Sequence, residues 1–192
     1  FLSSIQLPVF ASDIQAMWVV RDYMTRPEYI DEALEFAAEN NFNHIFAQVR
    51  GRGDAYYKSD IVSRSDIVKS NFDPLDYILR QSKRFNIKVH AWINVYYLWS
   101  ASRMPTQDDH ILKTHPQWLD TKEFQYVNVK KMLSTMNRSR VSNGEGFFLA
   151  PTHPDVEKYL LNIITELVRK YPVDGLHFDY IRYHDFEYGF NP

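Results

Sequence analysis

Residues 173–184, Val-Asp-Gly-Leu-His-Phe-Asp-Tyr-Ile-Arg-Tyr-His, decide the interpretation of this chain. The Asp-Gly pair predicts a turn, and residues 175–183 predict a β-strand. Because successive side chains of a strand point to opposite faces, His177 and Asp179 share one face. An ordinary core strand seldom carries such a face, since burying an unpaired charge is costly. We therefore expect a strand of a parallel barrel whose carboxyl end opens into an active site.

The rest of the chain alternates strand-like and helix-like segments. Further strands are predicted over residues 16–23, 44–50 and 87–96, which are rich in β-branched and aromatic residues. Each predicted helix begins at a capping signal with proline in its first turn: Thr25-Arg-Pro-Glu28, Asp73-Pro74 and Thr152-His-Pro-Asp155. This alternation predicts a parallel sheet with helices outside it.

Two architectures compete for this pattern, a doubly wound sheet and part of an eight-stranded (β/α) barrel. The dinucleotide-binding fingerprint Gly-x-Gly-x-x-Gly does not follow the first strand, and Gly51-Arg-Gly53 is too short to replace it. Polar residues at the carboxyl ends of three strands favour the barrel. The predicted fold class is α/β, of the TIM-barrel type, with about four βα units of an incomplete (β/α)8 barrel.

Composition excludes several classes of function. The 192 residues are 45% hydrophobic, enough for one domain, and the net charge of −2 argues against general nucleic-acid binding. Without cysteine, disulfides, thiolate metal sites and cysteine nucleophiles are excluded. No apolar run reaches the ~18 residues of a membrane span. The aromatic content of 16% suits stacking on a flat ligand such as a sugar ring.

The chain divides into a lead-in and a barrel domain. Residues 1–15 are mildly apolar and match either the end of a signal peptide or an extended lead-in. Residues 16–192 form the partial barrel. Its long insertion loop, residues 97–151, is too aromatic for disorder and predicts a cleft wall, through Trp99, His115, Trp118, Phe124 and Tyr126.

Polar side chains gather where the predicted strands end. We predict Asp179 as the catalytic carboxylate, and a group of substrate-binding residues that share this end of the sheet: Arg50, Arg52, Asp54, Tyr56, His90, Trp92, Asn94, His177 and Arg182. Each of these residues could instead have a purely structural role. The two histidines could be satisfied barrel residues, Trp92 could be core packing, and Arg50 could be the counter-ion of Asp179. Because three strands carry polar residues at the same end of the sheet, we favour the functional roles over the structural ones.

Six segments, in this order, resemble one known family: residues 46–57, 73–76, 90–94, 115–118, 153–156 and 175–183. They are similar to the bacterial glycosyl-hydrolase-like family ten, from about Trp18 to the C-terminus. The resemblance implies a (β/α)-barrel glycosidase that is often exported, to the periplasm, the cell surface or the medium, and is linked in some members to peptidoglycan. The chain departs from the family at His184, where proline is usual, and at Ala150, where a polar or acidic residue is expected.

Glycoside hydrolysis ordinarily needs two carboxyl groups. Asp54, Glu123 and Glu145 are local candidates for the second, which otherwise lies in a C-terminal half outside this chain. That half, or self-association, would close the barrel. If the Arg50 guanidinium lies beside Asp179, it should keep the Asp179 carboxylate ionised. An ionised carboxylate suits the role of a nucleophile or of an electrostatic stabiliser.

The leading hypothesis is therefore a hydrolase of a polysaccharide or peptidoglycan-type glycan, without cofactor or metal. Two alternatives remain. A metal-dependent hydrolase would use His90, His177 and Asp179 as ligands. A noncatalytic glycan-binding module would keep the aromatic cleft and lack the second carboxylate.

Overall fold

The computed structural model describes residues 13–101, 103–122 and 145–190. Several predictions fall outside these residues. They are the lead-in as far as residue 12, the cleft-wall residues Phe124 and Tyr126, and the carboxylate candidate Glu123.

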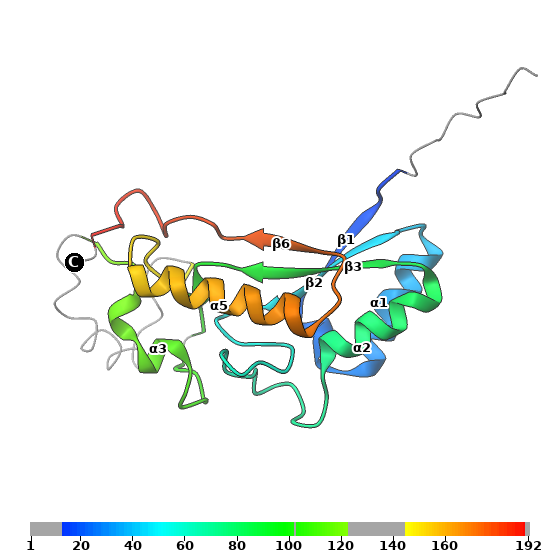
Figure 1. Ribbon diagram of the computed structural model, residues 1–192, viewed down its shortest axis with the longest axis horizontal. Helices are drawn as coiled ribbons and strands as arrows, with labels where there is room; N and C mark the ends of the chain where they lie inside the picture. The colour runs from blue at the N-terminus through cyan, green and yellow to red at the C-terminus, as the bar shows by residue number, and fades with distance from the viewer. Residues whose placement is uncertain (1–12, 102, 123–144, 191–192) are drawn as a thin grey trace, which may run out of the picture.

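The main sheet contains four parallel strands, which lie side by side in the order β1 (Ala16–Val19), β2 (His44–Arg50), β3 (Lys88–Asn94) and β6 (Gly175–Asp179) (Figure 1). The predicted strands and their order are confirmed, but three of them end early, β3 by two residues. The first strand stops where a 3-10 helix, η1 (Arg21–Thr25), begins. The last strand stops before Tyr180, whose φ of 52° is left-handed and breaks the extended backbone.

Helices cover one face of this sheet (Figure 1). They are α1 (Pro27–Glu39), α2 (Pro74–Gln81) with the 3-10 helix η2 (Ser82–Phe85), and α5 (Pro154–Lys170). The side chains beneath them are small or aliphatic, and Val89, Ala91 and Ile93 of β3 are at most 1% exposed. The apolar stripes of the helices bury these residues, which form the core.

The three helix starts differ in how well the sequence predicts them. Asp73 caps α2 as predicted, since its side chain accepts a hydrogen bond from the Asp76 backbone N–H. Thr25 does not cap α1, because it lies in η1 and its hydroxyl donates to the Asp22 carbonyl. At α5 the cap is His153, whose Nδ1 accepts from the Asp155 N–H, so the cap predicted at Thr152 is wrong.

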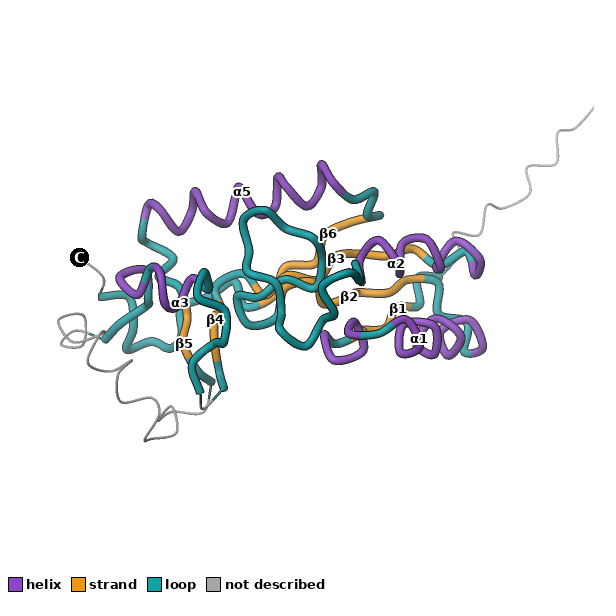
Figure 2. The backbone as a smooth tube through the Cα atoms, turned by 90° about the horizontal axis from the view of Figure 1, so that it is seen from below, coloured by secondary structure: helices purple, strands orange, loops and turns teal. Residues whose placement is uncertain are grey.

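The segment 97–151 carries secondary structure of its own. Strands β4 (Tyr97–Trp99) and β5 (Phe147–Phe148) pair antiparallel, and a short helix α3 (Ile111–Thr114) is followed by a 3-10 helix, η3 (Pro116–Trp118). Figure 2 shows this unit beyond the carboxyl ends of the main strands. Its role as a cleft wall stays a prediction. Within the described ranges, no helix is long and apolar enough to cross a membrane.

The sheet is strongly curved. Trp18 on β1 donates a hydrogen bond from its indole Nε1 to His177 Nε2 on β6, over 3.3 Å and across the two strands between them. The Phe46 ring of β2 lies beneath both, with ring centroids 5.3 Å from Trp18 and 4.7 Å from His177. Side chains of the first and fourth strands meet in this way only when the sheet curls towards a barrel. We call this side of the sheet the open face.

Candidate active site

Five side chains meet where the strands of the open face end, and we call them the carboxyl-end cluster. Gln48, Trp92 and His177 are in register on β2, β3 and β6, and Asn94 is in register with Asp179. The Asn94 amide donates to the Gly51 carbonyl over 3.0 Å and accepts from Gln48 Nε2 over 3.4 Å. Gln48 is not among the predicted site residues, although alternation along β2 places it on the same face as His44 and Phe46.

Asp179 lies at the end of this cluster with part of its surface exposed. Its Oδ1 accepts the Tyr180 N–H over 2.7 Å, and its carbonyl accepts the Val95 N–H over 2.8 Å, which continues the strand pairing beyond β3. In the part of the chain that the structure describes, no cation lies within 4.0 Å of its carboxylate. The carboxylate is therefore fixed by the backbone on one oxygen.

Arg50 does not lie beside Asp179, and the predicted convergence of these two residues is wrong. A register shift between Gln48 and Arg50 pairs Arg50 with Ile93, a residue of the helix-covered core. Its fully buried guanidinium donates to the Asn94 and Val95 carbonyls. A shift of one position turns a side chain to the other face, so the counter-ion role assigned to Arg50 is also wrong.

The loop after β2 is packed inward. Asp54 is buried and accepts the Arg52 N–H over 2.8 Å, while His110 Nε2 lies 2.9 Å from the Arg52 carbonyl. Tyr56 is 1% exposed, and burial followed by the charge of Asp54 raises its pKa. Asp54 and Tyr56 are therefore structural in this arrangement, and only Arg52 keeps some exposed surface.

His90 lies on the open face but below the carboxyl-end cluster, in register with Gly175 at the start of β6. Its Nε2 lies 2.7 Å from His44 Nδ1, and burial followed by the proximity of His44 lowers the pKa of His90. The Nε2 of His177 is occupied by the Trp18 indole. Across the described ranges, no group of three His, Asp or Glu side chains is placed to hold a metal ion. The predicted ligand set of His90, His177 and Asp179 is not assembled.

Arg182 stands at the rim, three residues after Asp179. Its Nη2 lies 2.7 Å from Glu145 Oε2, and its guanidinium covers the Phe148 and Tyr180 rings at 5.2 and 5.3 Å from their centroids. Its Nη1 donates to two carbonyls of the following loop. Arg182 therefore joins that loop to β5, and it holds Glu145 as an ion pair.

The two departures from the family pattern are both buried. Ala150 is fully buried beside η3, where its N–H donates to the Trp118 carbonyl, and a charged side chain there would lack solvent. His184 packs between the Phe148 and Tyr188 rings, and its N–H donates to Asp120. Burial lowers the pKa of His184. Both residues pack within the rim, against η3 and the loop after β6.

The carboxyl-end cluster offers one carboxylate acceptor, two amides, one imidazole and one indole ring on three adjacent strands. Such a set can hold the hydroxyls of a polar ligand while a flat apolar surface contacts its ring. Of the other carboxylates predicted for the site, Asp54 is buried and Glu145 is paired with Arg182. Of the predicted carboxylates that the structure describes, only Asp179 is neither buried nor in an ion pair.

Comparison with known proteins places these residues in context. The family model described as Glycosyl hydrolase-like 10 matches residues 11–192. The chain is 29% identical over 154 residues to glycosyl hydrolase DigH of Escherichia coli K12, covering 77% of this chain and 33% of the relative. It is 22% identical over 162 residues to glycosyl hydrolase YngK of Bacillus subtilis, covering 80% and 28%. The chain thus spans about a third of the length of these curated relatives.

Solved structures show the same fold. A hypothetical protein from Ruminiclostridium thermocellum matches with a TM-score of 0.63 at 20% identity, over 91% of this chain and 81% of that one. Alpha-L-fucosidase isoenzyme 2 from Paenibacillus thiaminolyticus matches with a TM-score of 0.59 at 18% identity, over 86% and 23%. These likenesses, together with the parallel sheet, confirm the predicted partial (β/α) barrel.

Proposed function

We propose that this chain, which belongs to the glycosyl hydrolase-like 10 family, carries part of a glycoside-cleaving site with Asp179 as its catalytic carboxylate. The substrate class is a polysaccharide or a peptidoglycan-type glycan, and the protein acts after export. One observation carries the proposal. Asn94 is in register with Asp179, and Trp92 with His177, at the end of a parallel sheet where barrel enzymes place their chemistry.

Asp179 acts as the ionised member of a carboxyl pair. The Tyr180 N–H donates to its Oδ1 and holds the carboxylate in one orientation. An ionised carboxylate serves as the nucleophile, or as the electrostatic stabiliser of an oxocarbenium-like transition state.

The proton donor comes from outside this chain. Asp54 is buried in the loop after β2, and Glu145 is paired with Arg182. Because this chain covers only 33% of the DigH relative, the remainder of a longer protein has room to supply the second carboxylate and to close the barrel. Self-association is the other way to cover the open face.

A second candidate function is a noncatalytic glycan-binding module. It is favoured by a separate observation, that Asp179 is the only predicted carboxylate in the described ranges that is neither buried nor in an ion pair. Such a module would use the amide, imidazole and indole of the carboxyl-end cluster to bind the glycan and would leave it intact.

The test compares Asp179→Asn with a matched control in the full protein that contains this chain. Asp185→Asn is the control, because Asp185 Oδ1 accepts the next backbone N–H over 2.7 Å, as Asp179 does, on an exposed loop. Binding of soluble peptidoglycan glycan strands is measured by calorimetry, and cleavage by the release of reducing ends.

We expect Asp179→Asn to bind within about threefold of wild type, and its cleavage to fall by about a thousandfold or more. Asp185→Asn should match wild type in both measurements. Wild-type cleavage by Asp179→Asn contradicts the proposal. Binding without cleavage by the wild-type protein favours the binding module.

A further inference from the structure

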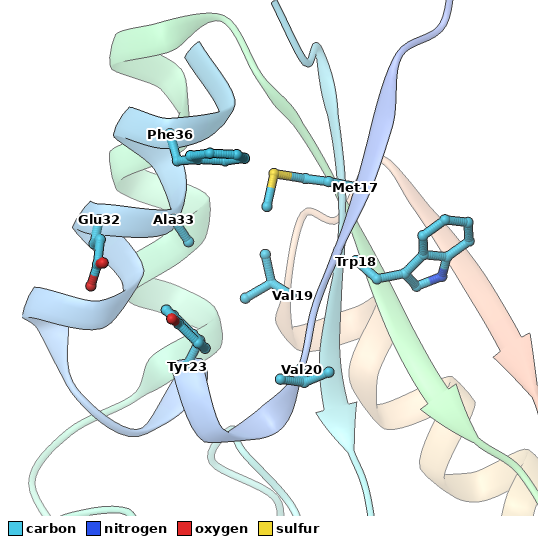
Figure 3. A pocket seen from close by; sticks show the side chains of 8 residues that line it. All are labelled: Met17, Trp18, Val19, Val20, Tyr23, Glu32, Ala33 and Phe36. Carbon is cyan, nitrogen blue, oxygen red and sulfur yellow. The ribbon is translucent and has the colours of Figure 1, made fainter. Parts of the chain in front are cut away.

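Trp18 lies on the side of β1 that faces away from the helices. Figure 3 shows Met17 and Val19 directed towards α1, where they line a hollow of about 330 Å³, while Trp18 points to the opposite side. From there its indole reaches His177, which is 159 residues distant in the chain. This contact joins the edge strand β1 to the strand that carries Asp179.

The hydrogen bond between these two side chains determines a proton position. An indole N–H is only a donor, whereas a neutral imidazole has one donor and one acceptor nitrogen. Because Trp18 Nε1 donates to His177 Nε2 over 3.3 Å, Nε2 must be the acceptor. A neutral imidazole that accepts on Nε2 carries its proton on Nδ1. A protonated imidazolium could not accept this bond.

Aromatic rings also hold the orientation of the imidazole. The centroids of Trp18 and Trp92 lie 6.0 and 6.1 Å from that of His177, both edge to face. The Phe46 ring lies 4.7 Å away. Of the two flanking indoles, only Trp18 donates to the imidazole, because Trp92 Nε1 is buried and has no partner in the described part of the chain.

We propose that Trp18 is a positioning residue that keeps His177 in its Nδ1–H tautomer. His177 then presents a hydrogen-bond donor on the strand face where Asp179 presents an acceptor. This donor–acceptor pair recognises a hydroxyl-rich ligand, and its assignment to a glycan rests on the proposed function. The tautomer itself does not depend on that function.

The first measurement reads the tautomer without any ligand. Nitrogen-15 NMR of labelled histidines distinguishes a protonated ring nitrogen from an acceptor nitrogen. In the wild-type chain we expect His177 Nε2 to be the acceptor. Trp18→Phe keeps an aromatic ring and removes the donor, so the protonated nitrogen should shift to Nε2 or become mixed.

Trp92→Phe is the matched control, because it removes an indole N–H at nearly the same centroid distance that makes no bond to His177. It should leave the tautomer unchanged. Trp18→Tyr restores a donor and should recover the wild-type signature. An unchanged tautomer in Trp18→Phe overturns the inference. So does a protonated Nε2 in the wild-type chain, a result that needs no variant to fold.

The second measurement uses soluble peptidoglycan glycan strands as the probe. Their addition should shift the His177 Nδ1 signal, and Trp18→Phe should bind them about fivefold to tenfold more weakly, the effect of one neutral hydrogen bond. Trp18→Tyr should recover most of the affinity. A fixed tautomer in a wild-type chain that binds no glycan contradicts the proposed function alone. Equal affinity of Trp18→Phe and wild type overturns the positioning role.

Discussion

The two faces of the main sheet are built from the same strands and from different kinds of residue. On β3, Val89, Ala91 and Ile93 pack beneath the helices and are almost fully buried. The residues between them, His90 and Trp92, lie on the open face and are partly exposed. Alternation thus separates two tasks along one strand, since one face stabilises the fold and the other carries the polar groups.

The side chains of the two faces are also held by different kinds of interaction. On the helix-covered face the stabilisation comes from apolar area removed from water, at about 25 cal/mol per Å². On the open face, hydrogen bonds connect side chains of different strands, such as Trp18 to His177 and Gln48 to Asn94. A change on the first face should therefore cost stability, and a conservative change on the second should alter binding first.

Neighbouring substitutions on β3 provide the largest test of this contrast. Ile93→Ala should lower the free energy of unfolding by about 3–4 kcal/mol, because it leaves a cavity in the helix-covered core. Trp92→Phe, on the adjacent residue and the open face, should cost about 1 kcal/mol or less. Urea denaturation of both variants measures the difference. Equal losses would show that the two faces do not divide stability and binding.

Arg50 tests where the boundary between the faces lies. Arg50→Ala should lower the free energy of unfolding by about 2–3 kcal/mol, because the buried Asn94 and Val95 carbonyls lose their donor. Arg182→Ala, which removes a partly exposed ion pair, should cost about 1 kcal/mol or less. Unfolding in urea again provides the measurement. A stable Arg50→Ala variant with impaired glycan binding would show that Arg50 contributes to the binding surface and not to the core.

The sequence predicts the strands well because their pattern is local. Residues 44–50 have the predicted bounds, and β3 lies within its predicted range. Strand ends are harder, since the turn after Asp179 depends on a left-handed Tyr180 that its residue type does not indicate. The register shift before Arg50 is invisible to any argument from parity, because one extra residue reverses every later assignment on that strand.

The sequence predicts only those site residues whose positions follow from the alternation of side chains along a strand. Asn94, His177 and Asp179 meet because their strands are in register, which alternation and parallel order together predict. The bond from Trp18 depends on the curvature of the whole sheet, so no local pattern indicates it. The loop after β2 is contacted at the Arg52 carbonyl by His110, the N-cap of α3, a helix from a distant part of the chain that the sequence does not predict.

His110 should make the packing of this loop sensitive to pH. It is buried with its Nδ1 accepting the Leu112 N–H and its Nε2 beside the Arg52 carbonyl, and burial lowers its pKa from the ordinary 6.5. The nearby charges are Asp54 and Asp109, which oppose this shift, and Arg50, which adds to it. The unfolded chain therefore takes up a proton before the folded chain does.

Stability should consequently be intact above pH 6.5 and should fall as the pH drops from there towards the folded pKa, by at most about 1.4 kcal/mol per pH unit. His110→Asn keeps a helix-capping acceptor without a titrating group and should flatten this slope. Urea unfolding at several pH values measures it. His115→Asn, at the partly exposed end of α3, is the control, and an equal effect of both variants would contradict the assignment.

The smallest effect concerns the helix that completes the covered face. His153 caps α5 through its Nδ1, whereas the preceding Thr152, a residue type more common at helix starts, forms no cap. His153→Ala should lower the free energy of unfolding by about 1 kcal/mol, because the Asp155 N–H loses its acceptor. Thr152→Ala should change it by less than about 0.5 kcal/mol. The α5 helix packs on the helix-covered face through Val156 and Leu160. Destabilising its first turn should therefore leave the hydrogen bond between Trp18 and His177 on the open face intact. Urea unfolding curves of the two variants measure both changes in the free energy of unfolding. A larger decrease for Thr152→Ala would show that Thr152, not His153, caps the helix.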